Sequence, residues 1–124
     1  MLKKSVLRRK ADFDRLYKKG ESAGDRYVVV FAIPNGLEES RLAFLASKKV
    51  GKSVERNRAR RLMKESYRLF SEDIPKGLDV VFIARNTINE RKQDEVGRSM
   101  QSAWKKIEKK LIKWDTLASS SADQ

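Results

Sequence analysis

The residues of this chain best suited to chemistry are cations, and most of them crowd into one segment. Residues 48–68 hold nine lysines or arginines and two glutamates, a net charge of +7. Residues 1–19 add a net +6, so the total of +12 lies in two blocks. Because a self-repelling block needs something outside the chain to neutralise it, the pattern indicates phosphate binding. RNA or DNA is the leading partner class.

Groups for side-chain catalysis are scarce. The sequence has no histidine, the commonest general base and metal ligand, and no cysteine for disulfides or zinc. Carboxylate-bound magnesium is conceivable, but the acidic pairs are scattered and typical of solvated surface: Glu38–Glu39, Glu72–Asp73 and Asp94–Glu95. We therefore assign no catalytic residue and no metal ligand.

Length and composition favour one small domain. The 124 residues are 40% hydrophobic, which suits a single modest core. No apolar stretch approaches the roughly 18 residues of a membrane-spanning helix, and the basic start lacks the apolar core of a signal peptide. We expect a cytoplasmic protein without membrane contact. A flexible basic arm is predicted at 1–9, the domain at 10–115 and a disordered tail at 116–124.

A short first helix is predicted at residues 11–19. Asp12 suits its first turn, where it meets the positive end of the helix dipole, and Gly20 is a natural stop. Phe13 and Tyr17 lie four residues apart and therefore share one face. Core packing is the simpler interpretation of that pair, and a stacking platform for bases is the functional one. The residues alone favour core packing.

Three clear strands follow from β-branched and aromatic runs. Residues 27–33 are apolar on both faces and end in Pro34-Asn35-Gly36, a turn sequence. Residues 41–47 are predicted to pair with them as an antiparallel hairpin, and residues 78–84 form another buried strand. The turn-like stretch at 21–25 can hold a short extra strand.

A basic helix is predicted from an N-cap at Ser53 to about Phe70. Steps of about 100° per residue divide it into two faces. One face is apolar and gathers Ala59, Leu62, Met63, Ser66, Leu69 and Phe70. The opposite face gathers Arg56, Asn57, Arg60, Arg61, Lys64 and Arg68, with Arg58 on the flank.

A final long helix is indicated by apolar residues that step by three or four: Val96, Met100, Ala103, Ile107, Leu111 and Trp114. Its lysines are most simply solubilising: Lys105, Lys106, Lys109, Lys110 and Lys113. The predicted fold class is α+β, with one four-stranded sheet of three clear strands and one short strand. The order of elements is α-β-β-β-α-β-α.

Three stretches in this order resemble the bacterial ribonuclease P protein subunit. SKKVG at 47–51 followed by RNRARR at 56–61 is similar to the RNR signature of that family. KADFDRLYKKG at 10–20 resembles its first helix, and VVFIAR at 80–85 its fourth strand. The resemblance covers roughly residues 3–112. A lone Arg-Asn-Arg is weak evidence, but the combination is highly specific.

The resemblance implies a subunit of a ribonucleoprotein nuclease. In the family, the RNA subunit carries the Mg²⁺-dependent active site that removes the 5′ leader of precursor tRNA, with Mg²⁺ held mainly by RNA and substrate. The protein binds the catalytic RNA and the leader, with one protein expected per RNA and no small-molecule substrate. The implied fold is ribosomal protein S5 domain 2-like, with a left-handed βαβ crossover instead of the common right-handed one.

The resemblance also implies two binding surfaces. Contacts with the catalytic RNA fall to Arg56, Asn57, Arg58, Arg60, Arg61, Lys64 and Arg68. Contacts with the leader fall to Phe13, Tyr17, Phe31, Lys48, Arg56 and Asn57. Stacking on aromatic rings tolerates any base, which suits a leader of variable sequence. This shifts the interpretation of Phe13 and Phe31 from core toward leader contact, with Tyr17 evenly balanced.

Two rival functions share some of these features. A ribosomal or general RNA-binding protein would have the same charge and the same lack of a catalyst, but no dependence on the leader. A stand-alone metal nuclease would cleave precursor tRNA without an RNA partner. The scattered acids argue against the nuclease.

Overall fold

The computed structural model describes the backbone of residues 6–122 and the side chains of residues 6–111. The elements are α1 (Lys10–Lys19), β1 (Glu21–Gly24), β2 (Val28–Pro34), β3 (Arg41–Ala46), α2 (Ser53–Arg68), β4 (Leu78–Ala84) and α3 (Gln93–Ala122), with short 3₁₀ turns at Ser71–Asp73 and Asn86–Ile88. The predicted α+β class and order of elements are confirmed, including the short strand β1.

The four strands form one mixed sheet in the order β1-β2-β4-β3. β2 runs antiparallel to both β1 and β4, whereas β3 runs parallel to β4. The predicted hairpin between residues 27–33 and 41–47 is therefore wrong. β4 is buried at six of its seven positions, which requires a central place between two strands. A β2–β3 hairpin would push β4 to an edge.

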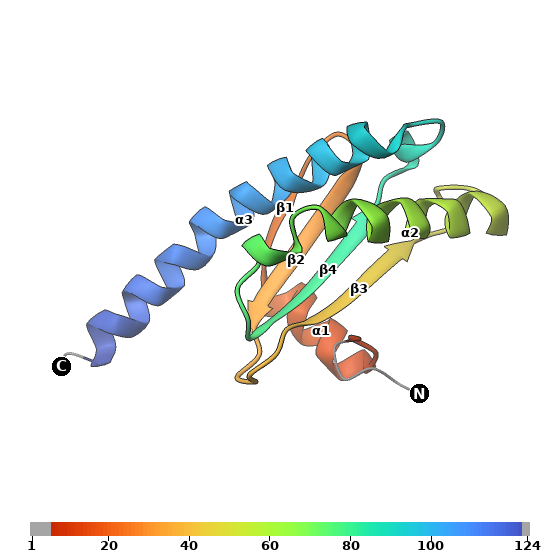
Figure 1. Ribbon diagram of the computed structural model, residues 1–124. Helices are drawn as coiled ribbons and strands as arrows, with labels where there is room; N and C mark the ends of the chain where they lie inside the picture. The colour runs from red at the N-terminus through yellow and green to blue at the C-terminus, as the bar shows by residue number, and fades with distance from the viewer. Residues whose placement is uncertain (1–5, 123–124) are drawn as a thin grey trace.

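The two faces of the sheet are covered unequally. α2 and α3 pack together on one face over the larger core, which includes Val30, Phe82, Met63 and Trp104. α1 packs on the other face over a small cluster centred on Leu16. In Figure 1, α2 and α3 run next to each other, while α1 lies apart from both near the C-terminal end of β2.

α1 is held against the sheet by little apolar surface. Leu16 is its only buried residue. The helix ends at Gly20, where a Cβ atom would lie 2.5 Å from the Leu16 carbonyl oxygen and 3.0 Å from that of Ala32. Glycine thus lets the chain turn closely from α1 into β1. Polar contacts must supply much of what fixes this helix.

The chain before α1 is anchored to the outer edge of β3. Leu7 is 3% exposed, and its N–H donates to the Leu42 carbonyl at 2.8 Å, next to an isolated bridge between Val6 and Leu42. Of the predicted flexible arm at 1–9, residues 1–5 lie outside the described range, and residues 6–7 are bound to β3. The domain bounds of 10–115 stay a prediction.

α3 differs from its prediction in two ways. Lys106 Nζ donates to the Gly24 carbonyl at 2.9 Å, and Lys110 Nζ donates to the Ser22 carbonyl. These two lysines bind the edge strand β1, so a purely solubilising role is wrong for them. The backbone of α3 continues to Ala122 through most of the predicted tail at 116–124, and residues 123–124 lie outside the described range. No helix within residues 6–122 has the length and apolar character needed to cross a membrane.

Candidate nucleic-acid interface

Three aromatic rings meet between α1 and the sheet. The ring centroids of Phe13 and Tyr17 lie 6.1 Å apart at a tilt of 31°. Tyr17 and Phe31 meet edge to face, with centroids 5.0 Å apart and an interplanar angle of 77°. The helical spacing of Phe13 and Tyr17 thus brings two rings close to one strand residue, and the three residues predicted to contact the leader form one cluster.

The aromatic cluster borders a half-covered part of the sheet. One end of this face is buried in the cluster that Leu7 and Leu16 form with Ile33 and Ala43, whereas Phe31, Leu45 and Ile83 remain only half-buried. Register explains the common face, since Phe31 pairs with Val81 and Leu45 with Ile83. Leu45 and Ile83 escaped the sequence-based reasoning because the partner of β3 was wrongly predicted.

Tyr17 combines packing with exposure. Its side chain is 41% exposed, the most open of the three rings, yet burial of its remaining part raises the pKa of the phenol above its usual value. Tyr17 therefore stays a neutral hydrogen-bond donor at physiological pH. Phe13 and Phe31 are half-buried, so both the core and the platform interpretations describe part of their surroundings.

The cations of α2 lie on the face of the helix that points away from the core. Ala59, Met63 and Ser66 are buried, as the two-faced pattern predicts. Arg61, Lys64 and Arg68 are exposed. None of the ion pairs found among the described residues involves a cation of α2. The self-repulsion of this face is therefore not relieved by ion pairing within the described chain.

Arg58 and Arg60 are less free than the cationic pattern predicts. Arg58 Nη2 donates to the Arg91 carbonyl at 2.8 Å, which turns Arg58 toward the loop before α3. Arg60 Nη2 donates to Asn57 Oδ1 on the same helix. Both cations still carry further N–H groups, since a guanidinium has five.

Arg56, Asn57 and Lys48 surround the start of α2. The Nε atom of Arg56 is buried without a partner, and its Nη2 atom lies 3.3 Å from Ser53 Oγ. Lys48 is exposed in the turn between β3 and α2. No hydrogen bond or ring contact among the described residues joins these three to the aromatic cluster. Their predicted leader contact thus rests on the resemblance.

Two details of α2 differ from the predictions. Ser53 is the first residue of the helix instead of its N-cap, which is Lys52 without a side-chain cap. The Ser53 hydroxyl accepts from Arg56 instead. The helix ends at Arg68 with Leu69 as its C-cap, and Leu69, predicted on the apolar face, is 70% exposed.

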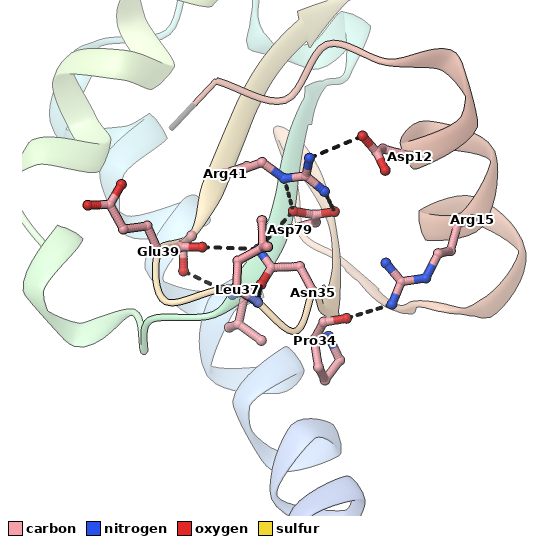
Figure 2. A network of polar contacts seen from close by, with 10 residues as sticks. Asp12, Arg15, Pro34, Asn35, Leu37, Glu39, Arg41 and Asp79 are labelled. Atoms are coloured by element: carbon pink, nitrogen blue, oxygen red, sulfur yellow. Dashed lines mark hydrogen bonds and ion pairs between the residues drawn. The ribbon is translucent and has the colours of Figure 1, made fainter. Parts of the chain in front are cut away.

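A buried ion-pair network lies beside the aromatic cluster and was missed from the sequence. Asp79 on β4 is fully buried and binds Arg41 on β3 through two parallel hydrogen bonds of 2.8 and 2.7 Å. Arg41 also reaches Asp12 on α1, as Figure 2 shows. The signal was present: a lone aspartate inside an apolar strand needs a buried partner.

Asn35 and Arg15 extend the network. Asn35 Nδ2 donates to Asp79 Oδ1 at 3.0 Å and to the Glu39 carbonyl at 3.1 Å. Arg15 Nη2 donates to the Pro34 carbonyl at 2.8 Å, which ties α1 to the end of β2 (Figure 2). The hydrogen bonds with Asp79, helped by the charges of Asp79 and Asp12, raise the pKa of Arg41 despite its burial. Arg41 is permanently charged.

Known proteins match most of this chain in sequence. The family model described as Ribonuclease P matches residues 1–108. The ribonuclease P protein component of Caldanaerobacter subterraneus subsp. tengcongensis is 39% identical over 104 residues, covering 84% of this chain and 90% of the relative. That of Clostridium botulinum strain Langeland is 42% identical over 106 residues, covering 85% and 96%.

Solved structures agree with these relatives. The RNase P protein of Staphylococcus aureus superposes with a TM-score of 0.74 at 31% identity, covering 83% of this chain and 94% of that one. The residues matched by the family model include both the aromatic cluster and the cationic helix. The chain belongs to the family of bacterial ribonuclease P protein components.

Proposed function

We propose that this protein binds the catalytic RNA of ribonuclease P through the cations of α2 and the 5′ leader of precursor tRNA through the aromatic cluster. The RNA subunit carries the active site, and the protein strengthens binding of substrates that still have a leader. One protein serves each RNA. The product is the mature 5′ end of tRNA.

One observation carries the proposal. A cluster of aromatic rings with an exposed member, Tyr17, lies on a half-open sheet face, and the cations of α2 form no ion pair with any residue whose side chain the structure describes. Rings offer stacking to bases of any identity, and free cations offer contact with phosphates. Single-stranded RNA needs both kinds of contact.

Magnesium belongs to the RNA in this proposal. Between residues 6 and 111, no group of three or more His, Cys, Asp or Glu side chains is placed to hold a metal ion. The protein's part is to bind and orient its partners, whereas bound Mg²⁺ would supply charge stabilisation at the scissile phosphate.

The test compares precursor and mature tRNA in the reconstituted holoenzyme. Adding the protein to its RNA subunit at moderate salt should speed Mg²⁺-dependent 5′ processing and should strengthen binding of precursor over mature tRNA. Equal strengthening for both tRNAs would instead mark a general RNA-binding protein. Cleavage by the protein alone, without the RNA subunit, would support the stand-alone nuclease.

A further inference from the structure

Arg41, the first residue of β3, binds both β4 and the first turn of α1. Its Nε and Nη2 atoms bind the two carboxylate oxygens of Asp79, and its Nη1 atom binds Asp12 Oδ2 at 3.2 Å. Figure 2 shows the guanidinium lying between β4 on one side and α1 on the other. The guanidinium thus reaches α1 from the sheet.

Asp79 of β4 holds the guanidinium of Arg41 in one orientation. Asp79 is 0% exposed, and its carboxylate accepts from Asn35 as well as twice from Arg41. A planar fork held by two parallel hydrogen bonds has little freedom to rotate. The third contact, with Asp12, is therefore made from a guanidinium already held in place. Arg41 and Asp12 are each only about one-fifth exposed, so water screens this contact less than a surface pair.

The position of Asp12 on α1 relates this contact to the aromatic rings. Asp12 and Leu16 are four residues apart and face the sheet, with Arg15 beside them. Phe13 follows Asp12 and Tyr17 follows Leu16, so each ring lies about 100° further round the helix than the residue before it. A roll of α1 about its axis would consequently move both rings relative to Phe31.

α1 has few other restraints against such a roll. A ten-residue helix is marginal on its own, and this one buries a single side chain, Leu16. Its other apolar contacts are made by the half-buried ring of Phe13 and by the edge of Tyr17 against Phe31, and these are the contacts that a roll would change. The bonds of Asp12 and Arg15 reach the ends of two different strands, at Arg41 of β3 and Pro34 of β2 (Figure 2).

We propose that Arg41 is a positioning residue for leader binding, which sets the roll of α1 through Asp12 and so holds Phe13 and Tyr17 against Phe31. The inference rests on the proposed function and adds a residue that touches no RNA. Loss of the Asp12 contact leaves the sheet and α2 intact, so recognition of the leader is weakened while binding of the RNA subunit persists.

The test uses Asp12→Asn with Asp14→Asn as its matched control. Both variants remove one negative charge from α1, but Asp14 is exposed and has no hydrogen bond or ion pair with the described residues. Charge alone would strengthen RNA binding slightly and equally in both. We expect Asp12→Asn to reduce the preference for precursor over mature tRNA by about three- to tenfold, part of the effect of one lost base stack. Asp14→Asn should retain the preference.

A conservative variant and a second affinity separate positioning from plain stability. Asp12→Glu keeps a carboxylate and should restore most of the preference, and the affinity of each variant for the RNA subunit should stay within about twofold of the parent. If Asp12→Asn and Asp14→Asn show the same preference for precursor over mature tRNA, the positioning role of Arg41 is overturned and the proposed function is not. Parallel losses for precursor tRNA, mature tRNA and RNA subunit would show only a folding defect and overturn the positioning role as well.

Failure of the proposed function has a different signature. In that case the parent holoenzyme itself would bind precursor and mature tRNA equally. This result would remove the ground for both proposals, whereas a parent with a clear preference leaves the Asp12 comparison to decide the second one.

Discussion

Phe31 is the residue at which packing and proposed binding meet. It sits in the middle of β2, pairs with Val81 on β4, and meets Tyr17 edge to face. Because its side chain is only half-buried, part of the ring remains accessible on the open half of the sheet. Its substitution therefore tests the leader surface without reaching the larger core.

Phe31→Ala should weaken binding of precursor tRNA to the holoenzyme by about tenfold, because a base stacked on an aromatic ring contributes roughly 1–3 kcal/mol. Binding of mature tRNA should change little. Phe31→Tyr keeps the ring and should resemble the parent, whereas Phe31→Leu keeps apolar bulk and should resemble alanine. Parent-like binding by the leucine variant would show that the ring does not stack on a base.

At the scale of elements, α2 carries the clearest separation of roles. Its buried side packs against α3 and the sheet, and its cations remain without ion pairs in the described chain. The exposed side can thus be altered without disturbing the core, because alanine is the best helix former.

Replacing Arg60, Arg61 and Lys64 together by alanine should lower the salt dependence of binding to the RNA subunit. Each lost phosphate contact reduces the magnitude of the slope of log affinity against log salt by about 0.7 to 0.9. The magnitude of the slope should therefore fall by roughly two to three in the triple variant. The matched control replaces Lys76, Lys105 and Lys109 by alanine, which removes the same charge from exposed positions outside α2. Equal slope changes in both variants would mean that α2 contributes only net charge.

Hydrogen bonds between α3 and the β1–β2 turn make the free energy of unfolding depend on pH. Burial alone would raise the pKa of Asp25, but hydrogen bonds from the Arg26 N–H and the hydroxyls of Ser102 and Ser99, with the charge of Lys106, lower it overall. A lowered folded-state pKa means that the unfolded chain binds the proton more readily.

The contribution of Asp25 should therefore be present above its unfolded pKa of about 3.9 and should vanish as pH falls through the folded value. Urea unfolding of Asp25→Asn and the parent should give free energies that differ at about pH 6 and converge in stronger acid. A gap that stays constant over this pH range would mean that the ionised carboxylate is not the stabilising form.

The sequence predicts the existence of elements better than their pairing. Hydrophobic periodicity located α1, α2, α3 and β4, because each has one strongly apolar face or is buried throughout. β2 is apolar on both faces, so its pattern says nothing about which strand lies beside it. The ion pair between Arg41 and Asp79 depends on that missing register, since the two residues pair across parallel strands. The rings of α1 were predicted because four-residue spacing is local.

For the whole molecule, the uneven distribution of charge is the dominant physical fact. The net charge of +12 resides in the N-terminal block and around α2, while the rest of the chain sums to −1. Such a distribution favours any state in which anions sit against α2.

Sulfate should accordingly raise the melting temperature of the isolated protein. Ligand at 100 times its dissociation constant adds about 2.7 kcal/mol, and each kcal/mol shifts the melting temperature by roughly 4 °C in a domain of this size. Sulfate also stabilises proteins generally, so the triple variant of Arg60, Arg61 and Lys64 is the reference. An identical rise in the triple variant would show that these cations are not the anion site.

The strand order has a consequence for how the chain assembles during synthesis. Among the strands of the described residues, β3 pairs with β4 alone, and the paired residues Arg41 and Asp79 are 38 positions apart in the chain. β1 and β2 alone form a two-stranded pair, which is marginal in water. Ribosomes release chains from the N-terminus at about 5–20 residues per second, so the segment of α2 emerges seconds before the strand that completes its platform. Until β4 and then α3 have emerged, the most cationic part of the protein lacks the surfaces it packs on and is nascent chain next to ribosomal RNA.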